Sequence, residues 1–392
     1  MIPGRLLRLL EPQERFDALQ SRFGRLGSRI ADLSYANFDG PLDAGVRDVL
    51  QKALATDRDR AFQYTPYGGS RTARRAVADA LSASHGAAFA WQDVVLTNGA
   101  AAALAIALRA LGQPGDEVVV PVPCWFDHPL YVEACGKTAV LVPLSDRDDF
   151  GLDVDALGAA VTRRTTALIV SNPANPTGRS YDDGTITRLG AMLSAAQRQL
   201  GTAITLVTDE THRDLAGASF AACSARYDRT LVVYSFGKYH LLQGQRLGYV
   251  AVAPAHPDRS LAADLVRWAR IAGNTTPTSL MQLAVPGLLA LRHDVAALDD
   301  WRGRYVSRLR SAGYRVVQPD GTHFVYVRTP AGLADEAWVE TLVREHKVLA
   351  VPSSLFHHTG YFRLSLTATP ERLAAALAAL EEAGTRWCRT SP

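Results

Sequence analysis

Six side chains or turns with distinct chemistry stand in the middle of the sequence, five of them soon after apolar runs. They are Gly99, Trp125, Asn175, Asp209, Lys238 and, eight residues beyond the lysine, Arg246. In an open α/β sheet, ligands bind at the carboxyl ends of the strands, so we expect these groups to meet in one crevice. They would supply an anion-binding turn, an aromatic plate, an amide, a carboxylate, an amine and a guanidinium to one ligand.

This combination meets the needs of pyridoxal 5′-phosphate chemistry. A lysine must form a Schiff base with the cofactor aldehyde, and Lys238 is the candidate. A carboxylate such as Asp209 would keep the pyridine nitrogen protonated, because opposite charges hold each other ionised. The flat ring of Trp125 could stack on the pyridine face.

The phosphate of this cofactor would need backbone amides and positive charge. The amides of Gly99, Ala100 and Ala101 open a predicted helix, and such a helix start binds phosphate. Ser235 adds a hydroxyl donor, and Arg246 can bind phosphate through two parallel hydrogen bonds.

Each of these residues also has an ordinary structural interpretation. A single lysine is most often on the surface, a carboxylate after a strand is often a cap, and a tryptophan is often in the core. The Asn-Pro-rich segment 172–178 could be only a turn. The joint placement of all these groups at successive strand ends favours a shared site.

Seven near-continuous apolar runs are expected to form the sheet that positions these groups. The predicted strands are 93–98, 117–123, 138–144, 166–173, 204–210, 230–236 and 247–254. Such runs are typical of a largely parallel sheet covered on both faces. Helical stretches such as 100–111 and 183–200 alternate with them, which predicts a doubly wound α/β domain.

The length of 392 residues favours two domains in one chain. We expect a large cofactor-binding domain over 41–272 and a smaller α+β domain over 273–392. Residues 1–40 are expected to pack on the smaller domain. Their basic, leucine-containing start has apolar runs that are too short for a signal peptide and indicates an amphipathic helix.

The order and spacing of the motifs resemble the fold-type I pyridoxal-phosphate enzymes of the class I/II aminotransferase family. The resemblance covers roughly residues 30–385 and is most specific in NPANPTG, TDETHRDL, SFGKYHLLQGQRLGY and FRLSLT. It implies an aspartate aminotransferase-like fold, with Lys238 as Schiff-base lysine and proton shuttle. It also implies that Asp209 pairs with the pyridine nitrogen, with support from His128, and that Asn175 binds the phenolic oxygen.

The resemblance further implies a substrate site and a homodimer. Arg363 would bind the substrate carboxylate as a fork, together with Asn175, and residues 33–37, Ala36 and Asn37 among them, would line the pocket. Segment 274–276 is a second candidate for the lining. Tyr64 resembles the tyrosine that reaches the cofactor phosphate of the neighbouring subunit.

His212 departs from the family pattern, which has a tyrosine three residues after the cofactor aspartate. A histidine could still contact the phenolic oxygen, but it is expected to titrate near neutrality. Gly237, Tyr239 and His240 around the lysine are further departures. They are compatible with drift in a working aminotransferase or with a repurposed catalytic site.

The expected function is an aminotransferase that moves an amino group between an amino acid and a 2-oxo acid. The alternative keeps the cofactor but performs β- or γ-elimination, replacement or carbon–carbon bond formation in specialised metabolism. A third possibility is a regulatory domain that binds the cofactor, but no helix-turn-helix stretch precedes residue 30.

Composition excludes several other classes. The 42 basic and 39 acidic residues are nearly balanced, which gives no electrostatic footprint for nucleic acid. No apolar run approaches the roughly 20 residues of a membrane span. The four cysteines fit no metal-ligand spacing, and we expect no metal and a cytoplasmic protein with reduced thiols.

Overall fold

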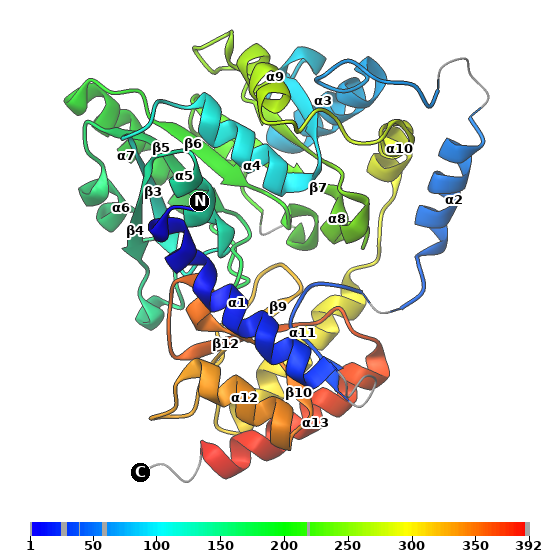
Figure 1. Cartoon of the computed structure of the whole chain (residues 1–392), viewed down its shortest axis with the longest axis vertical. Coiled ribbons are helices and arrows are strands. Elements are labelled where there is room, and N and C mark those ends of the chain that lie inside the picture. Colours follow the sequence, from blue (N-terminus) through cyan, green and yellow to red (C-terminus); the bar gives the residue numbers. More distant parts are fainter. Residues whose placement is uncertain (1, 25–29, 39, 57–60, 218–219, 389–392) are drawn as a thin grey trace.

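A seven-stranded sheet forms the centre of the larger part of the molecule (Figure 1). The computed structural model describes residues 2–24, 30–38, 40–56, 61–217 and 220–388. The strand order is β2-β8-β7-β6-β5-β3-β4. Only β8 runs antiparallel to its neighbours, so the predicted, mostly parallel sheet is confirmed. The bounds are β2 Val94–Thr97, β3 Glu117–Val122, β4 Thr138–Pro143, β5 Thr165–Ser171, β6 Thr205–Asp209, β7 Thr230–Ser235 and β8 Gly248–Val252.

Both faces of this sheet are buried, which explains why its strands are continuously apolar. One face packs against α4 (Gly99–Ala110) and α9 (Leu261–Ile271). The other face packs against two groups of helices. These helices are α2 Ala44–Leu54, α3 Arg71–His85, α6 Val154–Ala160, α7 Asp183–Leu200 and α10 Ser279–Ala290. Each fully buried aliphatic side chain contributes about 1.5–3 kcal/mol, so an alternating polar pattern would have destabilised either face.

A smaller antiparallel sheet, in the order β11-β12-β9, forms the second part (Figure 1). Its core is shared with three helices and the end of the N-terminal segment. The bounds are β9 Phe324–Arg328, β11 Val351–Pro352, β12 Tyr361–Ser365, α11 Ala296–Ser311, α12 Asp335–Glu345 and α13 Pro370–Trp387. In this sheet Arg363 is paired with Tyr326, which places the arginine in the middle of a buried strand.

The N-terminal segment packs on this smaller part. Helix α1 (Gly4–Gly24) is the expected N-terminal helix, and Phe16 within it joins the core of the small sheet. A two-stranded parallel pair, β1 (Ala31–Asp32) with β10 (Val348–Leu349), continues the attachment. An exposed ion pair of 2.8 Å between Arg15 and Glu336 adds little to stability by comparison.

Helix α10 packs with the large sheet, although the sequence predicts that residues 273–392 form the smaller domain. Its side chains Met281, Val285 and Leu288 share one apolar cluster with α2, α3 and the edge of the sheet. The change from one core to the other therefore comes after α10. An apolar helix next to a predicted boundary does not reveal which of two cores it will join.

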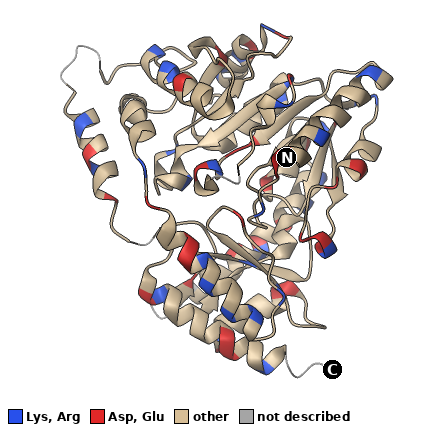
Figure 2. Ribbon diagram, turned by 180° about the vertical axis from the view of Figure 1, so that it is seen from behind, with Lys and Arg blue, Asp and Glu red and all other residues tan. Residues whose placement is uncertain are grey.

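Basic and acidic residues alternate along the outer helices (Figure 2). Over the described ranges, no helix is both long and apolar enough to cross a membrane.

Candidate active site

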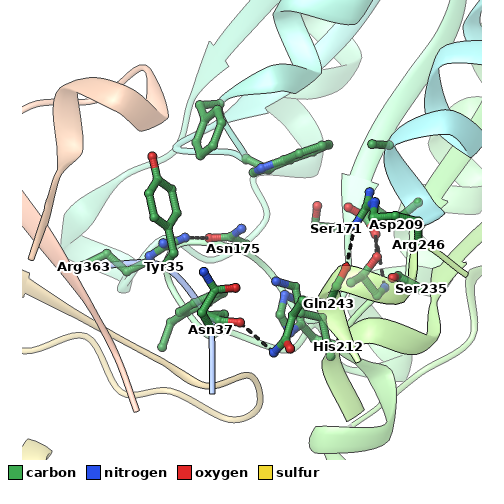
Figure 3. A pocket seen from close by; sticks show the side chains of 18 of the residues that line it. Tyr35, Asn37, Ser171, Asn175, Asp209, His212, Ser235, Gln243, Arg246 and Arg363 are labelled. Carbon is green, nitrogen blue, oxygen red and sulfur yellow. Dashed lines mark hydrogen bonds between the residues drawn. The ribbon is translucent and has the colours of Figure 1, made fainter. Parts of the chain in front are cut away.

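A cavity of about 390 Å³ opens at the carboxyl ends of the central strands, where the small sheet faces them (Figure 3). It gathers groups from both parts of the molecule and from the N-terminal segment. Its lining contains these predicted residues: Ala36, Asn37, Ala100, Ala101, Trp125, Asn175, Asp209, His212, Ser235, Lys238, Arg246 and Arg363.

Lys238 lies in the short helix α8 (Phe236–Tyr239), directly after β7. Burial, together with the nearby cations Arg363 and Arg246, lowers the pKa of Lys238 to about 8, against the opposing effect of Asp209. An amine with this pKa is partly neutral near pH 8, and the neutral form is the nucleophile and proton acceptor.

Asp209 ends β6 and is held as an anion. Burial acts to raise the pKa of Asp209, but contacts with His128, Thr211 and His212 outweigh it and lower this pKa. Its Oδ1 accepts hydrogen bonds from the Thr211 amide (3.1 Å) and hydroxyl (2.6 Å). Its Oδ2 lies 3.4 Å from Nε2 of His128, although the two atoms do not form a hydrogen bond within the described part of the chain, and the support expected from His128 stays a prediction. The carboxylate can therefore pair with a cationic ring nitrogen.

An anion cradle forms where α4 begins. Gly99 has φ +82°, and a Cβ at this position would lie 2.8 Å from Nη2 of Arg246. Gly99 itself is outside the cavity lining, whereas Ala100 and Ala101 line it beside Ser235 and Arg246. Helix-start amides, a hydroxyl and a guanidinium suit a phosphate dianion.

Arg363 is a buried guanidinium without an acidic partner. Its Nη1 donates to Asn175 Oδ1 at 2.8 Å (Figure 3). Its Nη2 donates to the Ser34 carbonyl, also at 2.8 Å. Phe324 and Phe356 cover it, with its Cζ 4.1 and 4.8 Å from their ring centres. Burial lowers the pKa of Arg363 to about 9. Among the described residues no carboxylate lies within ion-pair distance of it, so a ligand carboxylate would supply the missing charge.

His212 stays uncharged in this environment. Burial and the Lys238 cation lower the pKa of His212 well below 6.5, and Asp209 opposes them only in part. The expectation that His212 titrates near neutrality is therefore wrong, because a buried imidazole beside cations loses its proton readily.

The family of the chain follows from comparison with known proteins. The sequence model of the family described as aminotransferase class I and II matches residues 30–380. The chain belongs to the aminotransferase class I and II family.

Similarity to individual aminotransferases supports this family assignment. An aspartate aminotransferase of Pyrococcus abyssi is 28% identical over 335 residues, 81% of this chain and 83% of that protein. An aspartate/prephenate aminotransferase of Thermus thermophilus is 28% identical over 353 residues, 87% of each chain. The crystal structure of an amino transferase from Eubacterium rectale superposes with a TM-score of 0.89 at 28% identity, covering 99% of both chains.

Family membership makes the protein a pyridoxal-phosphate-dependent transferase that moves an amino group between an amino acid and a 2-oxo acid, as the sequence predicts. The comparisons do not favour the alternative of elimination, replacement or carbon–carbon bond formation.

Leu33 and Ser34, like Gly99, are outside the cavity lining, and two further expected positions, Tyr64 and segment 274–276, lie away from the cavity of their own chain. The Tyr64 side chain is fully exposed, and it lines a separate surface cavity with Thr275 and Thr276. Within one chain, therefore, neither Tyr64 nor segment 274–276 reaches the catalytic cavity. The expected reach of Tyr64 into a neighbouring subunit stays a prediction.

Several lining residues were not predicted. Phe126 and Ser171 follow strands and could have been found by the same strand-end argument. Gln243 donates to the Ala36 carbonyl at 2.7 Å and fixes the N-terminal segment over the cavity. Phe324 comes from the small sheet, and no local pattern pointed to it.

No group of three or more potential metal ligands lies together within the part of the chain that the structure describes.

Proposed function

We propose that the cavity binds pyridoxal 5′-phosphate and an amino acid next to each other. The observation that carries the proposal is that Lys238, Asp209 and Arg363 line one cavity together with Ala100 and Ala101 at the start of α4. Each side chain has the charge that its expected partner on the cofactor or substrate requires.

The residues present fit the cofactor. Lys238 would hold it covalently, Asp209 would pair with its ring nitrogen, and Trp125 would cover its ring. Ala100 and the other α4 amides, with Ser235 and Arg246, would hold its phosphate. Asn175 and His212 would face its phenolic oxygen. The positive φ of Gly99, with no room for a Cβ beside Arg246, supports close approach of an anion.

The reaction would use residues from both sheets. The bound cofactor supplies an electron-withdrawing ring that stabilises negative charge at the substrate Cα. Arg363 would clamp the substrate carboxylate in a fork and turn the Cα–H bond toward Lys238. Lys238 would accept that proton at Nζ and return it on the same face. Phe126, Phe324 and Trp125 would exclude water from the reacting atoms.

The charges of the lining also bear on the substrate side chain. Lys238, Arg246 and Arg363 each have a role in this proposal. Among the described lining residues of the same chain, no further cation remains for a second carboxylate. We therefore expect a donor with an uncharged side chain, although the relatives above are named for aspartate.

The proposal includes a homodimer in the cytoplasm. A tyrosine as exposed as Tyr64 is well placed to enter a second copy of the chain. All four cysteines are free, as expected in a reducing compartment.

Reduction of the holoenzyme with borohydride, followed by peptide mapping, tests the central assignment. We expect the cofactor to be fixed to Lys238. Labelling of Lys52, Lys137 or Lys347 instead would refute the proposed function. Addition of single amino acids while the absorption of the bound cofactor is followed then identifies the donor.

A further inference from the structure

A second cavity lies directly behind the catalytic one. This interdomain cavity has a volume of about 520 Å³ and lies between α8, the start of α11 and the start of α13. At two places, residues that are neighbours in the sequence line different cavities. Lys238 and Phe324 line the catalytic cavity, whereas Tyr239 and His323 line the interdomain cavity. The wall between the two cavities is therefore only about one residue thick.

Two histidines stand in this wall. The ring of His323 meets that of His212 edge to face, with 6.4 Å between centroids and 73° between planes. The ring of Phe324 also meets that of His212 edge to face, with 5.2 Å between centroids and 71° between planes. Both imidazoles are buried, and Nδ1 of each has no hydrogen-bond partner in the described part of the chain. The contact found between the two rings is their edge-to-face packing.

The backbone around His323 is fixed from both sides. The amide of Gly321 donates to the Gly178 carbonyl at 2.9 Å, which ties the segment to the loop that carries Asn175. The His323 carbonyl accepts from the Leu366 amide at 2.8 Å. The backbone that carries the His323 ring is thus fixed on both sides, which suits a structural wall better than a mobile acid or base.

We propose that His323 is a positioning residue whose ring closes the wall between the two cavities and shields His212, which lines the catalytic cavity, from water in the interdomain cavity. The proposal rests on the proposed function, because that function places His212 beside the phenolic oxygen. An uncharged imidazole there can donate one hydrogen bond without adding a full positive charge.

The electrostatic surroundings agree with this role. The titratable or charged groups that face the two rings are Lys238, Asp209, Arg302 and Arg363. Burial, with Lys238 and Arg302, lowers the pKa of His323 to about 3, so the ring that closes the wall carries no charge itself. Water admitted through the wall would reduce the desolvation of His212 and raise its pKa.

The test compares His323→Ala, which opens the wall, with His323→Phe, which keeps a ring there. Histidine resonances of the cofactor-free protein and absorption of the holoenzyme are both followed from about pH 5 to 9. The His212 resonance is assigned by its loss in His212→Asn. We expect the pKa of His212 to rise by about one unit or more in the alanine variant and the phenylalanine variant to resemble the parent. The pH dependence of the bound cofactor's absorption should likewise change in His323→Ala and stay as in the parent in His323→Phe.

Leu298→Ala is the matched control, because Leu298 lines only the interdomain cavity and its truncation leaves the wall intact. It should behave as the parent. Equal shifts of the His212 pKa in His323→Ala and His323→Phe would show that the imidazole itself is required and not merely a ring at this position. That result would refute the proposal that the ring closes a wall. An unchanged His212 titration in His323→Ala, or in His323→Val if alanine does not fold, would overturn it as well. A failure of borohydride to label Lys238 would refute the proposed function. The His212 titration in the cofactor-free protein would still test whether His323 closes the wall.

Discussion

At the scale of single residues, the cavity carries more positive than negative charge. Lys238, Arg246 and Arg363 are its cations, and Asp209 is its one carboxylate among the described lining residues. Burying unpaired cations is costly unless a ligand compensates them. Burial without such compensation lowers the pKa of Lys238 and of Arg363. A phosphate dianion and a substrate carboxylate would supply the missing negative charge.

Replacement of Arg363 by lysine tests the fork at this scale. Lysine keeps the charge but loses the two parallel donors, so it is not conservative at such a site. We expect substrate binding to weaken by about 1.5–3 kcal/mol, or roughly 10- to 100-fold in KM. Steady-state kinetics measure the effect. Arg328→Lys, an exposed position of the same small sheet, is the control and should leave KM unchanged.

At the scale of elements, the site depends on where strands stop and helices begin. β6 ends at Asp209 and β7 at Ser235, and α4 starts at Gly99 with a backbone that favours glycine. The parallel neighbours β6 and β7 place their carboxyl ends at one edge of the sheet. Two polar groups far apart in sequence thereby reach the same cavity.

Replacement of Gly99 by alanine tests the cradle. The added Cβ would meet Arg246 at 2.8 Å, and φ +82° strains any residue with a side chain by about 1–3 kcal/mol. We expect the cofactor to dissociate roughly tenfold more readily, an effect of about 1.4 kcal/mol. Titration of the cofactor-free protein with pyridoxal phosphate measures it.

Gly86 offers a matched control for this strain. It also has a positive φ, +65°, but a Cβ there meets nothing within 4 Å. Gly86→Ala should lower the melting temperature without changing cofactor affinity. Equal cofactor affinity in Gly99→Ala and the parent would remove the cradle from the phosphate site.

At the scale of the whole molecule, the site is assembled from three separate parts of the chain. The large sheet carries Lys238 and Asp209, the small sheet carries Arg363, and the N-terminal segment carries Asn37. A fourth contribution, Tyr64, is expected from a second copy of the chain, because within one chain it lies exposed and outside the cavity.

Mixed dimers test that contribution. Lys238→Ala subunits are combined with Tyr64→Ala subunits, and activity is measured per heterodimer. If Tyr64 serves the neighbouring site, each heterodimer has one site with both substitutions and one intact site. We expect half of the parental activity to return. Activity no higher than that of the Tyr64→Ala protein would place Tyr64 outside the partner's site. A parent protein that sediments as a monomer would exclude the dimer.

The sequence alone determined the strands and the groups that follow them. All seven apolar runs form strands within a few residues of their predicted ends, because a strand covered on both faces must be apolar throughout. Lys238, Asp209 and Asn175 were found from their positions after such runs, because parallel topology brings strand ends together.

Only the tertiary structure decided what depends on contacts between distant segments. It placed α10 with the large sheet, brought His323 and Phe324 against His212, and enclosed Arg363 between two phenylalanine rings. His323 lies more than a hundred residues from His212, and no local period or spacing connects them. The charge of His212 also depends on this packing, because desolvation by surrounding side chains, and not the residue type, moves its pKa away from 6.5.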